Sequence, residues 1–131
     1  MERILDWNKY LDTAAKMVSE GIVMLKNENN ALPLDADKEV AVFGRIQFHY
    51  YKSGTGSGGM VNVTKVVNIL DGLIDNGVKV NEKLLDTYRK WDKENPFDLG
   101  EGWGGEPWSQ KEMLLDEGLV KETAKSCETA I

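Results

Sequence analysis

The chain has 131 residues, of which 41% are hydrophobic and 29% charged, an ordinary composition for a soluble domain with a modest core. Its formal net charge is −6, from 22 acidic and 16 basic side chains, and a surface of that sign repels phosphate backbones. We therefore expect no nucleic acid partner. The single cysteine, Cys127, excludes an internal disulfide, and the single histidine, His49, excludes a Cys/His zinc site. We expect neither a metal nor a cofactor.

The N-terminal sequence lacks the basic segment and long apolar run of a signal peptide. No stretch approaches the roughly 20 apolar residues that span a bilayer. The expectation is a cytoplasmic protein with no membrane partner.

Hydrophobic spacing predicts a first helix from about Asp6 to about Glu20. Its buried stripe is expected to consist of Leu11, Ala14, Ala15 and Val18. The apolar run 22–25 that follows is either a buried strand or the end of this helix, and periodicity does not separate the two. Residues 40–43 form a continuous apolar run closed by Gly44, which is typical of a buried parallel strand.

Three further helices are predicted, at about 64–76, 82–94 and 116–126. Asn81 and Asp116 are suitable N-cap residues for the second and third of these. Residues 78–80 and 129–131 resemble short strands. The alternation predicts an α/β fold with a mainly parallel sheet.

We interpret residues 1–131 as one incomplete domain, with a leading helix and linker at 1–38 and the sheet and helices at 39–131. A sheet with so few strands keeps open edges. We therefore expect self-association into a homo-oligomer through exposed edges or apolar faces.

Residues 54–59 formally contain the GxGxxG pattern of dinucleotide-binding proteins. The geometry is poor, because nine residues separate Gly44 from Gly54, whereas in that fingerprint the glycines follow the strand directly. A glycine-rich loop also lets backbone amides and a small hydroxyl approach a sugar. A surface loop with no ligand role is the third interpretation.

Other residues near this loop and in the segment 95–110 suggest binding roles. Arg45 follows the best strand directly, so it either reaches the crevice or forms a structural salt bridge. Trp103 and Trp108 either stack on a sugar at an outer subsite or are buried in the core or in an inter-domain contact. The carboxylates beside these tryptophans, on Glu101, Glu106 and Glu112, are interpreted as solvated acids of a structural loop. His49 is expected to be a hydrogen-bonded loop histidine.

Several segments, in this order and spacing, resemble glycoside hydrolase family 3 of the β-glucosidase type. The resemblance rests on residues 18–28 (VSEGIVMLKNE), 31–34 (ALPL), 40–44 (VAVFG), 52–59 (KSGTGSGG), 67–73 (VNILDGL) and 107–113 (PWSQKEM). It implies a partial three-layer α/β sandwich, of the type that forms this family's C-terminal domain. The chain begins with sandwich-type sequence, so it resembles the subgroup in which the sandwich precedes the (β/α)8 barrel.

The resemblance also implies the hydrolysis of terminal non-reducing β-D-glucosyl residues with retention. The aspartate nucleophile would lie in the barrel and the glutamate acid/base on a later sandwich loop, so this chain would hold no catalytic residue. Its glycine-rich loop would contribute to the sugar subsite, with Ser57 bonding the sugar, Gly56 and Gly58 shaping the loop, and Tyr51 and Arg45 nearby.

The implied partners are a β-glucoside or oligosaccharide substrate, the missing barrel and the remainder of the sandwich. Two alternatives stay open on the sequence. One is a stand-alone carbohydrate-binding or assembly module, and the other is a nucleotide-binding α/β domain.

Overall fold

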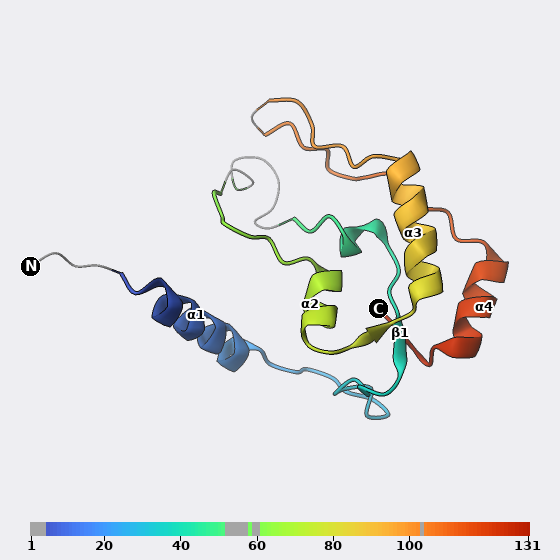
Figure 1. Ribbon diagram of the computed structural model, residues 1–131, viewed down its shortest axis with the longest axis horizontal. Coiled ribbons are helices and arrows are strands. Elements are labelled where there is room, and N and C mark those ends of the chain that lie inside the picture. The colour runs from blue at the N-terminus through green and yellow to red at the C-terminus, as the bar shows by residue number, and fades with distance from the viewer. Residues whose placement is uncertain (1–4, 52–57, 59–60, 103) are drawn as a thin grey trace, which may run out of the picture. The chain divides into compact units, whose positions relative to one another are not determined.

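The computed structural model describes residues 5–51, 58, 61–102 and 104–131 (Figure 1). Contacts within the chain divide it into two compact units, one ending at Pro33 and the other running from Leu34 to Ile131. In the described part of the chain, no helix has the length and apolar character that crossing a membrane requires.

The first unit contains one helix, α1, from Trp7 to Gly21. Asp6 is its N-cap, and the Asp6 carboxylate accepts a hydrogen bond from the Lys9 amide at 3.1 Å. The predicted bounds are correct to within one residue at each end. The predicted buried stripe is wrong for this unit, because α1 has no buried residue. The run 22–25 forms neither strand nor helix.

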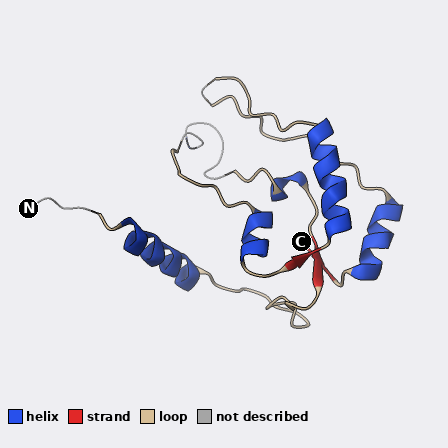
Figure 2. Ribbon diagram, in the orientation of Figure 1, coloured by secondary structure: helices blue, strands red, loops and turns tan. Residues whose placement is uncertain are grey.

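The second unit is built on a three-stranded parallel sheet (Figure 2). The strands are β1 (Glu39–Ala41), β2 (Lys79–Val80) and β3 (Thr129–Ala130), in the order β2-β1-β3. Val40 pairs with Val80 on one side of β1 and with Thr129 on the other. The sheet and its helices confirm the predicted α/β class, with β1 as the central strand.

Helices α2 (Ile69–Asp75), α3 (Glu82–Glu94) and α4 (Glu117–Ser126) complete the second unit. The predicted caps of α3 and α4 are confirmed, because Asn81 accepts from the Leu84 amide at 3.0 Å and Asp116 from the Gly118 amide at 2.6 Å. The predicted start of α2 at residue 64 is wrong. Asn68 caps this helix, and its side chain accepts from the Asp71 amide at 2.7 Å.

The core divides into two clusters because successive side chains of a strand point to opposite faces of the sheet. The first cluster contains Ala41, Leu84, Tyr88 and Cys127. The second contains Val42, Leu70, Val80 and Leu85. Helix α3 contributes to both clusters, with Leu84 and Tyr88 in the first and Leu85 in the second. Burial raises the pKa of the Tyr88 phenol, which keeps this side chain neutral in the core.

Truncation of Leu85 tests this packing. Leu85 is 1% exposed, so Leu85→Ala should lower the free energy of unfolding by about 2–5 kcal/mol through lost burial and a residual cavity. Leu114→Ala is the matched control, because Leu114 is 95% exposed and its truncation should change stability by less than about 0.5 kcal/mol. Urea unfolding of the chain measures both. Equal effects of the two substitutions would contradict the assigned core.

Candidate functional site

The candidate site begins where the chain leaves the carboxyl end of β1. Gly44 has φ = +88°, a conformation that favours glycine, and it turns the chain into the short 3-10 helix η1 (Arg45–Gln47). Gln47 is fully buried, and its Nε2 donates to the backbone oxygens of Val42 at 3.3 Å and Gly44 at 2.9 Å. The buried Gln47 side chain therefore stabilises this turn. Ligands of open parallel sheets bind outside this edge.

Arg45 is the centre of a buried polar cluster at this edge. Its side chain is 3% exposed, and Nη2 donates to Asp92 Oδ1 and to the Asn95 carbonyl, both at 2.6 Å. Nη1 donates to the Lys111 carbonyl at 2.9 Å. The Arg45 amide donates to Glu112 Oε2 at 2.9 Å. One side chain thus connects η1, the C-terminal end of α3 and the segment around residue 111.

Aromatic rings enclose this guanidinium. Its Cζ lies 4.9 Å from the ring centroid of Trp91 and 5.3 Å from that of Phe97, within the range of cation–π attraction. His49 stacks on Phe97 with centroids 4.6 Å apart, and His49 Nε2 lies 2.8 Å from Asp92 Oδ2. The two carboxylate oxygens of Asp92 therefore serve two different side chains. His49 is the hydrogen-bonded histidine that the sequence predicts.

Tyr51 extends the cluster toward the glycine-rich segment. Its ring is tilted against Phe97, with centroids 5.7 Å apart, and its hydroxyl accepts from Gln110 Nε2 at 3.3 Å. Gln110 also binds the backbone of Asp98, donating to its oxygen at 2.7 Å and accepting from its amide at 3.0 Å. Residues 45–51 are therefore fixed against the segment 95–112.

The predicted site residues have three different placements. Arg45 and Tyr51 come together in the cluster described above. Gly58 is exposed, and Trp108 is 95% exposed in the segment between α3 and α4. The predictions for Gly56, Ser57 and Trp103 fall outside the described residues.

Sequence reasoning missed Asp92, Phe97 and Gln110. A signal for Asp92 was present, because it lies four residues after Tyr88 and seven after Leu85 on the inner face of α3. A carboxylate at such a position requires a cation nearby. Phe97 and Gln110 belong to an irregular segment in which no periodicity identifies inward-facing side chains.

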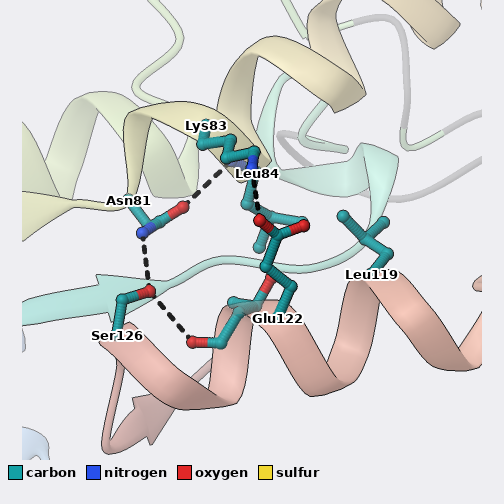
Figure 3. Close-up of a pocket in the computed structure, with 7 residues that line it drawn as sticks. Asn81, Lys83, Leu84, Leu119, Glu122 and Ser126 are labelled. Atoms are coloured by element: carbon teal, nitrogen blue, oxygen red, sulfur yellow. Dashed lines mark hydrogen bonds and ion pairs between the residues drawn. The ribbon is translucent and has the colours of Figure 1, made fainter.

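A separate groove of about 320 Å³ lies between α3 and α4 (Figure 3). Its polar side chains bind one another, since Asn81 Nδ2 donates to Ser126 Oγ at 3.3 Å and Lys83 forms an ion pair with Glu122. The hydrogen bond from Lys83 holds the pKa of the Glu122 carboxyl below its usual range. Because these polar side chains bind one another between α3 and α4, we interpret the groove as a result of the packing of the two helices.

Comparison with known proteins identifies relatives of the chain. Residues 22–130 match the glycosyl hydrolase family 3 C-terminal domain. The chain is 60% identical over 127 residues to a β-glucosidase of Ruminococcus albus, covering 97% of this chain and 13% of that protein. It is 31% identical over 132 residues to β-glucosidase A of Butyrivibrio fibrisolvens, covering 99% of this chain and 15% of that protein.

Solved structures give the same result. A β-glucosidase from Paenibacillus barengoltzii superposes with a TM-score of 0.83 at 48% identity, covering 98% of this chain and 14% of that chain. β-Glucosidase 3B from Thermotoga neapolitana in complex with glucose superposes with a TM-score of 0.76 at 28% identity, covering 95% of this chain and 17% of that chain. The chain therefore spans a small part of the length of the relatives it matches.

Neutralising Asp92 tests the cluster. Asp92→Asn should lower the free energy of unfolding by roughly 3 kcal/mol, because it leaves the buried Arg45 charge without its counter-ion. Asp86→Asn is the matched control on α3, since Asp86 pairs with Arg89 at 3.1 Å but has a side chain 71% exposed. That substitution should change stability by less than about 0.5 kcal/mol. Thermal or urea unfolding measures both, and a small effect at Asp92 would show that the pair contributes little.

Proposed function

Because the chain belongs to glycosyl hydrolase family 3, with residues 22–130 in its C-terminal domain, we propose that it is part of a retaining β-glucosidase. The substrate of the whole enzyme would be a terminal non-reducing β-D-glucosyl residue of a glucoside or oligosaccharide. The observation that carries this proposal is the 60% identity to a β-glucosidase over nearly the entire chain.

The chemistry of retention requires two carboxyl groups about 5–5.5 Å apart, one as nucleophile and one as acid/base. We assign neither to this chain. Two acidic side chains at the candidate site serve structural partners: Asp92 binds Arg45 and His49, and Glu112 binds the Arg45 and Met113 amides. Glu106 has a buried carboxylate oxygen without a hydrogen-bond partner among the described residues, but the family resemblance places neither reacting carboxyl in this segment. Taken alone, the chain is therefore expected to be catalytically inert.

The role we assign to this chain is to contribute the glycine-rich loop to the sugar subsite. Ser57 would hydrogen-bond the terminal glucosyl unit, while Gly56 and Gly58 would shape the loop. Support comes from the residues that precede the loop, since Arg45 and Tyr51 fix the chain at the carboxyl edge of the sheet. We place Tyr51 at the border of the same subsite, while the 3% exposed Arg45 supports this edge through its salt bridge to Asp92.

The exposed ring of Trp108 supports a second contact with carbohydrate. An indole that is 95% exposed offers a flat apolar face, and aromatic faces pack well against pyranose rings. We propose that Trp108, together with Trp103, forms a stacking platform at an outer subsite. The remaining partners are the barrel and the rest of the sandwich domain, which would supply the reacting carboxylates.

The loop assignment is tested in a full-length chimera, in which this chain replaces the matching segment of the Ruminococcus albus β-glucosidase. Ser57→Ala should lower kcat/KM on a chromogenic β-glucoside by about 5–10-fold, through loss of one hydrogen bond to the sugar. Ser19→Ala on α1 is the matched control, because the Ser19 hydroxyl bonds only the Ala15 carbonyl among the described residues. Unchanged kinetics for Ser57→Ala would reject the loop assignment.

A further inference from the structure

Helix α1 is amphipathic, and within the first unit its apolar side holds no buried residue. The apolar side chains recur at helical spacing and form one stripe. They are Trp7, Tyr10, Leu11, Ala14, Met17 and Val18. Leu11 is 59% exposed and Val18 is 65% exposed. A stripe of this kind normally faces a core, so its exposure marks a surface that another structure covers.

The run that follows α1 continues this surface. Ile22, Val23, Met24 and Leu25 are all exposed, from 60% for Met24 to 93% for Leu25. Single exposed apolar residues are ordinary, but four in succession beside an apolar helical stripe exceed that pattern. We call residues 7–25 the apolar arm.

The polar side of α1 does not favour a lipid surface. It carries Lys9, Asp12, Lys16 and Glu20, so positive and negative charges balance, and Lys16 pairs with Glu20 at 3.7 Å. Helices that lie on membranes are rich in Lys and Arg on this side. A protein surface is the better match for the apolar arm.

Comparison of the matched ranges points to the identity of that surface. The family domain match begins at residue 22, which leaves α1 outside it. The similarity to the Ruminococcus albus enzyme nevertheless covers 97% of this chain, so it includes most of α1. The match covers only 13% of that enzyme, so most of its length lies beyond the matched segment. The helix thus lies in a segment shared with the longer relative, ahead of the range that matches the family domain.

We infer that the apolar arm docks onto the part of the β-glucosidase polypeptide that lies beyond the segment matched by this chain. The inference rests on the proposed function, because the partner is the remainder of that enzyme. Leu11 and Val18 are the central contacts, and residues 22–25 extend them. The arm thereby fixes this chain against the rest of the enzyme.

Hydrogen exchange tests this docking in the same full-length chimera and in the isolated chain. Amides of α1 should exchange at least about 10-fold more slowly in the chimera, because a short helix without tertiary contacts is marginal in water. Leu11→Asp with Val18→Asp should remove this protection. Thr13→Asp with Ser19→Asp adds the same charge to the same helix away from the stripe, and should keep it.

Each outcome has a defined meaning. Equal exchange of α1 in the chimera and the isolated chain overturns the inference. Protection of α1 in the isolated chain also overturns it. If that protection weakens on dilution, the partner of the helix is a second copy of the chain. If it does not weaken, the partner is the second unit of the same chain. If the Asp variants fail to fold, the comparison of the unmodified chimera and chain still decides. A chimera that is inactive but shows protection of α1 refutes the proposed function and leaves the docking of the apolar arm supported.

Discussion

The second unit depends on the burial of one charge. The Arg45 guanidinium is 3% exposed and would be costly to bury without compensation. Asp92 supplies the opposite charge at 2.6 Å, and the carbonyl oxygens of Asn95 and Lys111 accept the remaining Nη hydrogen bonds described above. Charge-assisted bonds of this kind are short and directional. The segments that provide them are therefore held in one arrangement.

This constraint determines how the chain leaves the central strand. Gly44 turns the backbone, Arg45 pins it to α3, and His49 and Tyr51 pack on Phe97. The residues that enter the glycine-rich segment thus start from a fixed base at the carboxyl edge of the sheet. Such a base suits a loop that positions a sugar, because a loop orients a ligand only as well as its ends are fixed. Under the proposed function, bond cleavage would depend on groups outside this chain.

Local chemistry made most of the regular elements predictable. Asn81 and Asp116 mark the starts of α3 and α4 because their side chains satisfy free amides of the first turn. The apolar run beginning at Val40 identifies the central strand. The assigned strand ends at Ala41, although the Phe43 amide still donates to the Ile131 carbonyl at 2.8 Å. Helix α2 starts later than periodicity predicts, because Asn68 provides a cap within the apolar run.

The side-chain cluster was less predictable because its contacts are distant in sequence. Arg45 and Asp92 are 47 residues apart, and no local pattern pairs them. The exposed stripe of α1 differs from expectation for a related reason: periodicity identifies an apolar face but not the structure that covers it. Most of the glycine-rich segment lies outside the described residues, so its contribution to a sugar subsite stays a proposal.

A double-mutant cycle between Arg45 and Asp92 tests the central claim most directly. Urea unfolding of Arg45→Met, Asp92→Leu and the double variant yields the coupling free energy of the two side chains. The account predicts a coupling above about 1.5 kcal/mol, with the double variant more stable than the sum of the single effects implies. Additivity within about 0.5 kcal/mol would contradict it, because the two charges would then not depend on each other.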